Sequence, residues 1–206
     1  MHGLVNRALQ RFVCDTYSAD VWAVVVEEAA VGIDTFESML RYDDSVSEAM
    51  LAASVLVLDK PRDALLEDLG NYLVAHPNCE VLRRLLRFGG ETFTEFLGSL
   101  DDLPERARLA VPDLELPVIA VLEQEPNNHE ILIWAQYHGI CHVLAGVLRG
   151  MADDYGALAR IEHRGVFPGG QRLSVRIHDV AFAKGRQFNL APTGVVEPSR
   201  KSWQRA

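Results

Sequence analysis

Apolar positions in the first 111 residues recur at helical spacing. Between Gly3 and Tyr17 they fall three and four positions apart, which places them on one face of a helix. Cap residues, prolines and glycines then divide the stretch into segments. The pattern predicts about seven helices and no clear strand. These helices cover residues 3–17, 19–30, 36–40, 49–58, 61–75, 80–88 and 93–111.

The ends of these predicted helices carry their own signals. Ser45 with Glu48, and Thr92 with Glu95, have the spacing of a capping box, in which side chain and backbone satisfy each other's free polar groups. Pro61 suits the first turn of a helix, where its missing N–H would have no partner. These signals fix the predicted starts of the helices over residues 49–58, 61–75 and 93–111.

After residue 111 the period of the pattern changes. Residues 118–123, 130–137, 158–167 and 172–180 have the composition of short strands, whereas residues 139–155 return to helical spacing. Turn sequences separate the strands within each pair, and tight turns join antiparallel strands. The sequence therefore predicts an α+β fold. A helical subdomain is followed by a four-stranded antiparallel sheet with one inserted helix.

The last segment differs from the rest in charge. Residues 183–206 hold five basic side chains against one acidic side chain, in a chain that is acidic as a whole. We expect a domain over residues 1–182, made of a helical part (1–111) and a sheet part (112–182). We interpret residues 183–206 as a basic, flexible tail, with docking on the acidic body as the alternative.

Charge and composition exclude several classes of protein. The 206 residues carry a formal net charge of −9 and a pI near 5.2, which argues against a nucleic-acid partner. The longest apolar runs, Val55–Leu58 and Val24–Val26, are far shorter than the roughly 20 residues of a membrane span. We find no signal-peptide pattern, and three widely spaced cysteines argue against a disulfide framework. We therefore expect a cytoplasmic protein with no membrane span.

Several short motifs occur in a fixed order along the chain. They comprise Met1–Leu9, Leu65–Gly70, Leu82–Leu85, Phe93–Leu103, Pro112, Pro117, Gly146 and Gly150. Together they resemble the haem nitric oxide/oxygen-binding (H-NOX) family, which includes the sensor domain of soluble guanylate cyclase and stand-alone bacterial gas sensors. The resemblance covers about residues 1–180. It implies a helical subdomain beside a four-stranded antiparallel sheet, with haem b held between them.

A proline stands at the family's haem-ligand position. In the family, a histidine that follows the pattern Leu-Asp-x-Leu binds the haem iron, and this chain has Leu100-Asp101-Asp102-Leu103-Pro104 there. Proline offers no basic nitrogen to iron. Leu100 and Pro104 share a helix face, so we expect position 104 to point into the pocket. We also expect proline to break the helix at this point.

The family's second signature, Tyr-x-Ser-x-Arg, holds the haem propionates. An ungapped alignment puts Ile133, Ala135 and Tyr137 at its three positions. Taking Tyr137 as the tyrosine puts Gly139 and Cys141 at the other two. Both alignments lose the arginine, and with it the bidentate contact that a guanidinium makes with a carboxylate. Because both anchors are changed, we expect no haem bound in the family manner.

Three residues form the pattern nearest to a metal or alternative haem site. His138 and His142 are one helical turn apart, with Cys141 beside them, but Gly139 lies between them where strand gives way to helix. They are weak candidates, and Cys141 is otherwise a small buried apolar side chain. Three other histidines show no partner pattern, and we assign no role to His129, His163 and His178.

These observations predict a non-catalytic signalling sensor or adaptor. The chain has no Gly-x-Ser-x-Gly, phosphate-binding loop or dinucleotide fingerprint. An unfilled haem-sized void is costly, so we expect side chains such as Leu100, Ile133, Trp134 and Tyr137, or a hydrophobic small molecule, to fill the site. The resemblance implies a separate partner, such as a histidine kinase or a cyclic-di-nucleotide enzyme. Two alternatives stay open: a haem-based gas sensor with an unorthodox ligand, and a ligand-free structural adaptor.

Overall fold

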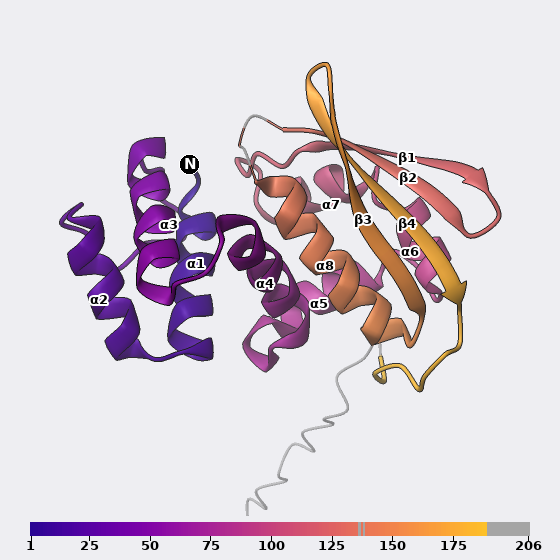
Figure 1. Cartoon of the computed structure of the whole chain (residues 1–206), viewed down its shortest axis with the longest axis horizontal. Coiled ribbons are helices and arrows are strands. Elements are labelled where there is room, and N and C mark those ends of the chain that lie inside the picture. Colours follow the sequence, from indigo (N-terminus) through magenta and orange to yellow (C-terminus); the bar gives the residue numbers. More distant parts are fainter. Residues whose placement is uncertain (136, 138, 189–206) are drawn as a thin grey trace, which may run out of the picture.

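The computed structural model describes residues 1–135, 137 and 139–188. Helices form one side of the molecule and a four-stranded antiparallel sheet the other, and one long helix lies between them (Figure 1). This is the predicted α+β architecture. The helices are α1 (Gly3–Thr16), α2 (Ala19–Ala29), α3 (Asp44–Leu58), α4 (Arg62–Ala75), α5 (Glu80–Arg87), α6 (Phe93–Gly98), α7 (Leu103–Ala110) and α8 (Ile140–Tyr155).

Helices α1–α4 enclose the first of two hydrophobic clusters. Its fully buried side chains include Val13, Val25, Phe36, Met50 and Leu65. Helix α1 begins at Gly3 because His2 caps it, with the ring nitrogen Nδ1 accepting a hydrogen bond from the Leu4 N–H at 3.2 Å. The apolar stripe read from the sequence is thus the face that packs inward.

In this half one predicted helix is absent and one predicted helix start is wrong. The segment 36–40 is not helical, because the Phe36 side chain is fully buried and packs edge-on against Trp22 and Tyr42. Helix α3 begins at Asp44, five residues before the expected start, because the Asp43 carboxylate accepts the N–H of Ser45 at 2.8 Å. Tertiary packing and an earlier cap therefore override the local signals.

The helix predicted over residues 93–111 is two helices. Helix α6 starts at the predicted capping box, in which Thr92 and Glu95 satisfy each other's backbone groups. It ends at Gly98, and α7 begins at Leu103 with Pro104 in its first turn. The break expected near Pro104 is confirmed. Proline is accommodated because the first turn needs no N–H donor.

The sheet belongs to the second half of the chain. Its strands are β1 (Val118–Glu125), β2 (Asn128–Trp134), β3 (Leu158–Phe167) and β4 (Gly170–Asp179). They lie in the order β1-β2-β4-β3, and every pairing is antiparallel, as predicted. The turn before β2 places Asn127 at φ +66°, a conformation that asparagine tolerates. Strand β2 ends at Trp134, three residues before the predicted end.

The second hydrophobic cluster lies between this sheet and helices α5–α8. Its fully buried members include Phe96, Leu97, Leu100, Ile131, Leu148, Leu173 and Val175. The alternating apolar residues of β4 face this core, which accounts for the period of two in the sequence. Helix α8 covers one face of the sheet and separates it from α4 (Figure 1).

Helices α4 and α8 cross with their backbones in contact. A Cβ at Gly146 would clash with the carbonyl oxygen of Glu67 and lie 2.8 Å from the main-chain nitrogen of Asn71. A Cβ at Gly70 would clash in the same way with the carbonyl of Val143. Only glycine permits so close an approach, and this crossing joins the two halves of the molecule.

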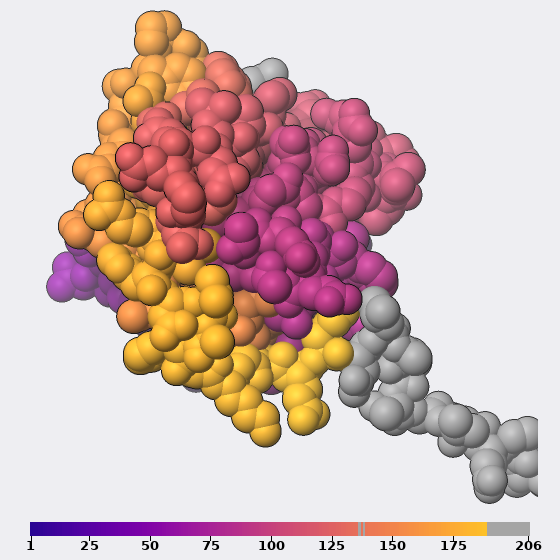
Figure 2. All heavy atoms as spheres, turned by 90° about the vertical axis from the view of Figure 1, so that its right-hand side faces the viewer, coloured from indigo at the N-terminus to yellow at the C-terminus, as the bar shows by residue number. Residues whose placement is uncertain are grey.

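Residues 183–188, at the start of the predicted tail, are bonded to the helices. The N–H groups of Ala183 and Arg186 donate to carbonyl oxygens at the C-terminal end of α8, at 3.0 and 2.8 Å. Phe188 packs edge-on against the ring of Phe88, which follows the last residue of α5. Figure 2 shows this segment in yellow at the lower edge of the molecule. The rest of the predicted tail, residues 189–206, lies outside the described residues.

Within the part of the chain that the structure describes, no helix is long and apolar enough to cross a membrane. The described helices are instead amphipathic or buried segments of the two clusters.

The α4–α8 crossing predicts that Gly146→Ala destabilises the protein. The added methyl group meets backbone atoms of α4, which cannot move aside as a flexible side chain can. We expect the free energy of unfolding to fall by about 1–3 kcal/mol, the usual cost of overpacking a core. Urea denaturation measures this change.

Gly98→Ala is the matched control for this substitution. A Cβ at Gly98 has no neighbour within 4 Å, and the backbone there is not left-handed. We expect this variant to be neutral, or to gain up to about 1 kcal/mol from the lower entropy of the unfolded chain. Equal stability of the two variants would contradict the close backbone contact between α4 and α8.

Candidate ligand-binding cavity

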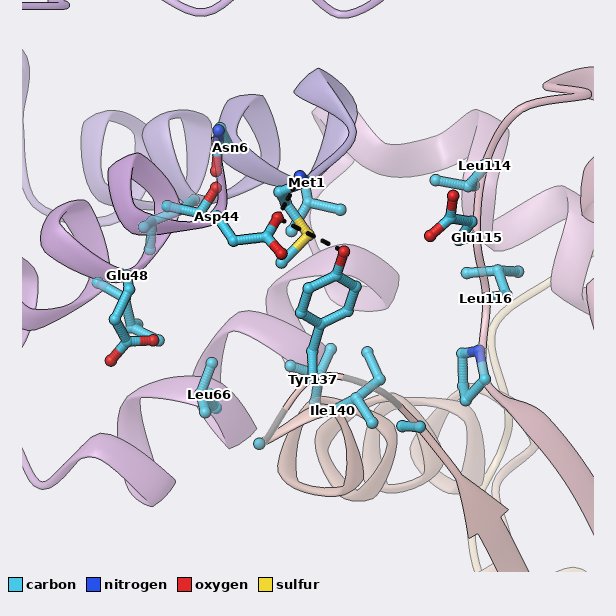
Figure 3. A pocket seen from close by; sticks show the side chains of 18 of the residues that line it. Met1, Asn6, Asp44, Glu48, Leu66, Leu114, Glu115, Leu116, Tyr137 and Ile140 are labelled. Carbon is cyan, nitrogen blue, oxygen red and sulfur yellow. Dashed lines mark hydrogen bonds and ion pairs between the residues drawn. The ribbon is translucent and has the colours of Figure 1, made fainter. Parts of the chain in front are cut away.

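A cavity of about 840 Å³ lies between the two halves of the molecule. It is lined by residues of α1, α3 and α4, of the segment 112–118 and around the start of α8. Figure 3 shows Leu66 of α4 and Ile140 of α8 on the same side of the cavity, with Leu114 and Leu116 across from them. The volume lies within the roughly 300–1,000 Å³ of small-molecule pockets.

Most of the cavity wall is apolar. The aliphatic side chains that line it are Val5, Leu9, Leu51, Leu66, Leu69, Leu114, Leu116, Val118, Ile140 and Val143. Trp134 and two prolines, Pro112 and Pro117, complete this surface. Such a wall stabilises an apolar ligand by removing its surface from water. It would penalise any polar group that found no hydrogen-bond partner there.

Two of the three arginines that line the cavity are held by carboxylates, and the third, Arg108, forms no ion pair with a described residue. Arg62 forms a two-point ion pair with Glu48, and the second of its contacts is 2.9 Å long. Arg41 contacts Glu115 at 3.0 Å and also donates to the carbonyl oxygen of Asp113 at 2.8 Å. The guanidinium groups of Arg41 and Arg62 are therefore already committed to partners within the protein.

Tyr137 is the central polar side chain of the cavity. Its hydroxyl group donates to Asp44 Oδ1 at 3.5 Å, and the same carboxylate forms an ion pair with the Met1 amino group (Figure 3). Desolvation raises the pKa of the Tyr137 phenol, and the charge of Asp44 raises it further. The phenol is therefore neutral at physiological pH and acts as a hydrogen-bond donor.

Three polar contacts join the two halves beside the cavity. They are the hydrogen bond from Tyr137 to Asp44, the ion pair of Arg41 with Glu115, and a 3.4 Å contact of the His2 ring with Asp113. Each partner comes from a segment far away in the sequence. Sequence reasoning missed His2 and Arg41, since no local pattern marks a contact across about 70 or more positions.

The structure separates the residues that the family comparison predicted for the haem site. Ala135 and Tyr137 line the cavity. Leu100 and Ile133 belong to the core of the sheet half, with exposed fractions of 0% and 1%, and do not line it. Pro104 is also buried without lining the cavity. The wall near α7 is formed instead by Arg108, which lies one turn further along that helix.

The two candidate metal ligands that the structure describes also lie away from the cavity. Cys141 and His142 lie on α8 but do not line the cavity, and His138 lies outside the described residues. Cys141 is fully buried, and its sulfur is 3.6 Å from Nδ1 of His163. The part of the candidate group that is described therefore faces β3 rather than the cavity.

The described lining does not fit a histidine-ligated haem. Among the described residues that line the cavity there is no histidine and no cysteine, and the arginines Arg41 and Arg62 are paired with carboxylates. Tyr137, at one of the propionate positions, faces Asp44 instead of offering a positive charge. The donor set does not suit iron ligation by histidine, and only one of its arginines, Arg108, is free of a described carboxylate partner that would compete with a propionate.

Fold and cavity together define an α+β domain with a ligand-sized space between its halves. The model of the haem-NO-binding family matches residues 2–163. The chain therefore belongs to the haem-NO-binding (H-NOX) family. This is a family of sensor domains, which are not themselves catalytic.

Relatives and solved structures agree with this assignment. The chain is 23% identical over 154 residues to soluble guanylate cyclase gcy-31 of Caenorhabditis elegans, covering 75% of this chain and 22% of that protein. It is 27% identical over 93 residues to the rat guanylate cyclase soluble subunit beta-2, covering 45% of this chain and 14% of that protein. The chain thus spans under a quarter of these relatives.

Two solved structures show the same fold. The Fe(II) unliganded H-NOX protein from K. algicida superposes with a TM-score of 0.75 at 16% identity, covering 89% of this chain and 100% of that one. The H-NOX protein from S. oneidensis in the Fe(II)NO state gives 0.73 at 17% identity, covering 87% and 100%. The likeness extends over both halves of the domain.

The burial of Cys141 predicts that its thiol is inert. Desolvation raises its pKa to about 12, so the reactive thiolate is scarce at pH 8. We expect iodoacetamide to modify the half-buried Cys14 and Cys79 first and to leave Cys141 unmodified. Peptide mapping by mass spectrometry gives the order of labelling, and all three thiols should react in urea. Labelling of Cys141 first in the folded protein would contradict its burial.

Proposed function

We propose that this chain is a sensor domain that binds a hydrophobic small molecule between its two halves. The observation that carries the proposal is the 840 Å³ cavity with its aliphatic wall. Membership of a sensor family supports the role. The position of the cavity supports it as well, because a ligand there contacts both halves at once.

The chemistry of the wall indicates the class of ligand. A mostly apolar molecule is favoured, since most of the wall is aliphatic and two of its three arginines, Arg41 and Arg62, already have carboxylate partners. The Tyr137 hydroxyl group offers one place where a hydrogen-bond acceptor of the ligand could bind in competition with Asp44. An anionic group of the ligand could pair with Arg108 without breaking an ion pair between described residues, whereas Arg41 and Arg62 would have to exchange their carboxylate partners.

The cavity also bears on the two alternatives. A gas sensor that keeps haem b by an unorthodox ligand draws no support from Cys141 or His142, because neither lines the cavity. A ligand-free adaptor calls for a site filled by side chains. Leu100 and Ile133, two of the side chains expected to fill it, lie in the core instead. Of the three alternatives, these positions therefore best support the binding of a hydrophobic ligand.

We propose that the ligand changes how the halves meet. The contacts of His2 with Asp113 and of Arg41 with Glu115 lie beside the cavity, and both acidic partners are largely exposed. A ligand that fits one arrangement of the halves better than another shifts the population toward it. The changed surface would act on a signalling protein such as a histidine kinase or a cyclic-di-nucleotide enzyme. The three free cysteines suit a cytoplasmic setting.

The cavity predicts binding of the neutral apolar dye N-phenylnaphthylamine. We expect a saturable, one-to-one rise in dye fluorescence with the folded chain. Ile140→Trp places a larger side chain in the cavity, so we expect binding at least roughly tenfold weaker, equivalent to about 1.4 kcal/mol. Fluorescence titration at fixed salt measures both affinities.

Val81→Trp is the matched control, because it adds the same side chain at a position that is 83% exposed and outside the cavity. Its dye affinity should equal that of the unmodified chain. If Ile140→Trp also binds the dye with unchanged affinity, the cavity is not the binding site and the proposed function fails.

A further inference from the structure

Three side chains from three elements converge on the outer side of the α4–α8 crossing. Glu67 comes from α4, His142 from α8 and His163 from β3. One ligand atom of each lies within 4.8 Å of the other two. The two imidazole rings face each other with centroids 4.1 Å apart. None of the three lines the cavity, so this cluster is a separate site.

The distances within the cluster suit a small cation. Glu67 Oε1 lies 3.6 Å from His142 Nδ1 and 3.1 Å from His163 Nε2. Ligands in a tetrahedral zinc site are roughly 3.3 Å apart, given Zn–N and Zn–O bonds of about 2.0–2.1 Å. The observed separations lie on either side of this value. His142 Nδ1 is moreover buried without a hydrogen-bond partner, which leaves its lone pair available.

A second layer of groups supports these ligand atoms. The other ring nitrogen of His142 lies 3.4 Å from Asp63 Oδ1, and that of His163 lies 3.6 Å from the Cys141 sulfur. A carboxylate behind a histidine fixes the ring orientation and the tautomer in most protein metal sites. The other oxygen of Glu67 is held by Arg149. Each ligating side chain is therefore positioned by a neighbour.

We propose that Glu67, His142 and His163 bind one Zn²⁺ ion, with water completing the tetrahedron. Two imidazoles and a carboxylate are ligands that zinc accepts, in a site that keeps one open position. The ion would link α4 to α8 and β3, and so fasten the helical half to the sheet half. This inference does not depend on the proposed ligand of the cavity.

Titration of the chelator-treated full chain with ZnCl₂ tests the site. We expect one ion bound per chain by calorimetry, together with a rise in the unfolding temperature. Glu67→Gln, His142→Ala and His163→Ala should each weaken binding at least about 100-fold. Asp63→Asn removes only the outer support of His142, and should weaken binding about tenfold. His178→Ala, an exposed histidine on β4, is the matched control and should bind as the unmodified chain does.

Co²⁺ gives a second readout that does not depend on stability. We expect visible absorption bands of tetrahedral Co²⁺ in the unmodified chain and in His178→Ala, and their loss in His142→Ala. Failure to bind either ion, or equal binding by His142→Ala and His178→Ala, would overturn the site. The second result would place the ion elsewhere on the chain.

Discussion

The crossing of α4 and α8 is the contact on which the rest of the structure depends. Gly70 and Gly146 remove the side chains that would hold the two helices apart, so backbone meets backbone. Helix α4 thereby serves both hydrophobic clusters, to which it contributes Leu65 and Val74. Residues of both helices line the cavity, and other residues of both helices form the separate cluster around Glu67. A site for an apolar ligand and a site for a cation are thus built on one junction.

The chain keeps the H-NOX fold, whereas the resemblance implies other residues at the positions that serve haem in that family. Pro104, aligned with the iron ligand, is buried in the first turn of α7, where a proline costs no hydrogen bond. Tyr137, at the place of the propionate arginine in the ungapped alignment, binds Asp44 across the cavity. In both alignments the arginine is lost, so both changes would remove a contact with haem. The cavity itself has aliphatic walls, and two of its three arginines are paired with carboxylates.

Periodicity predicted most of the fold, because most elements bury one regular face. Strand β3 has the predicted bounds, and the Thr92 capping box forms as read. The failures have different causes. Phe36 looked like part of a helix but packs in the core against Trp22 and Tyr42, whereas α3 starts earlier than predicted because Asp43 caps it. The contacts at the cavity and in the Glu67 cluster were harder to predict than the fold. The packing of α8 against β3 brings His142 to His163, and the chain fold brings His2 to Asp113. Neither pairing leaves a local pattern in the sequence.

The central claim is that the family fold has been kept without family-type haem binding. An absorption titration of the purified chain with haemin, after expression with a haem precursor, tests it most directly. We expect no Soret band in the purified protein and no saturable binding of haemin. We expect the same result for Pro104→His, because position 104 does not line the cavity. A sharp Soret band that saturates at one haem per chain in the unmodified protein would contradict the account.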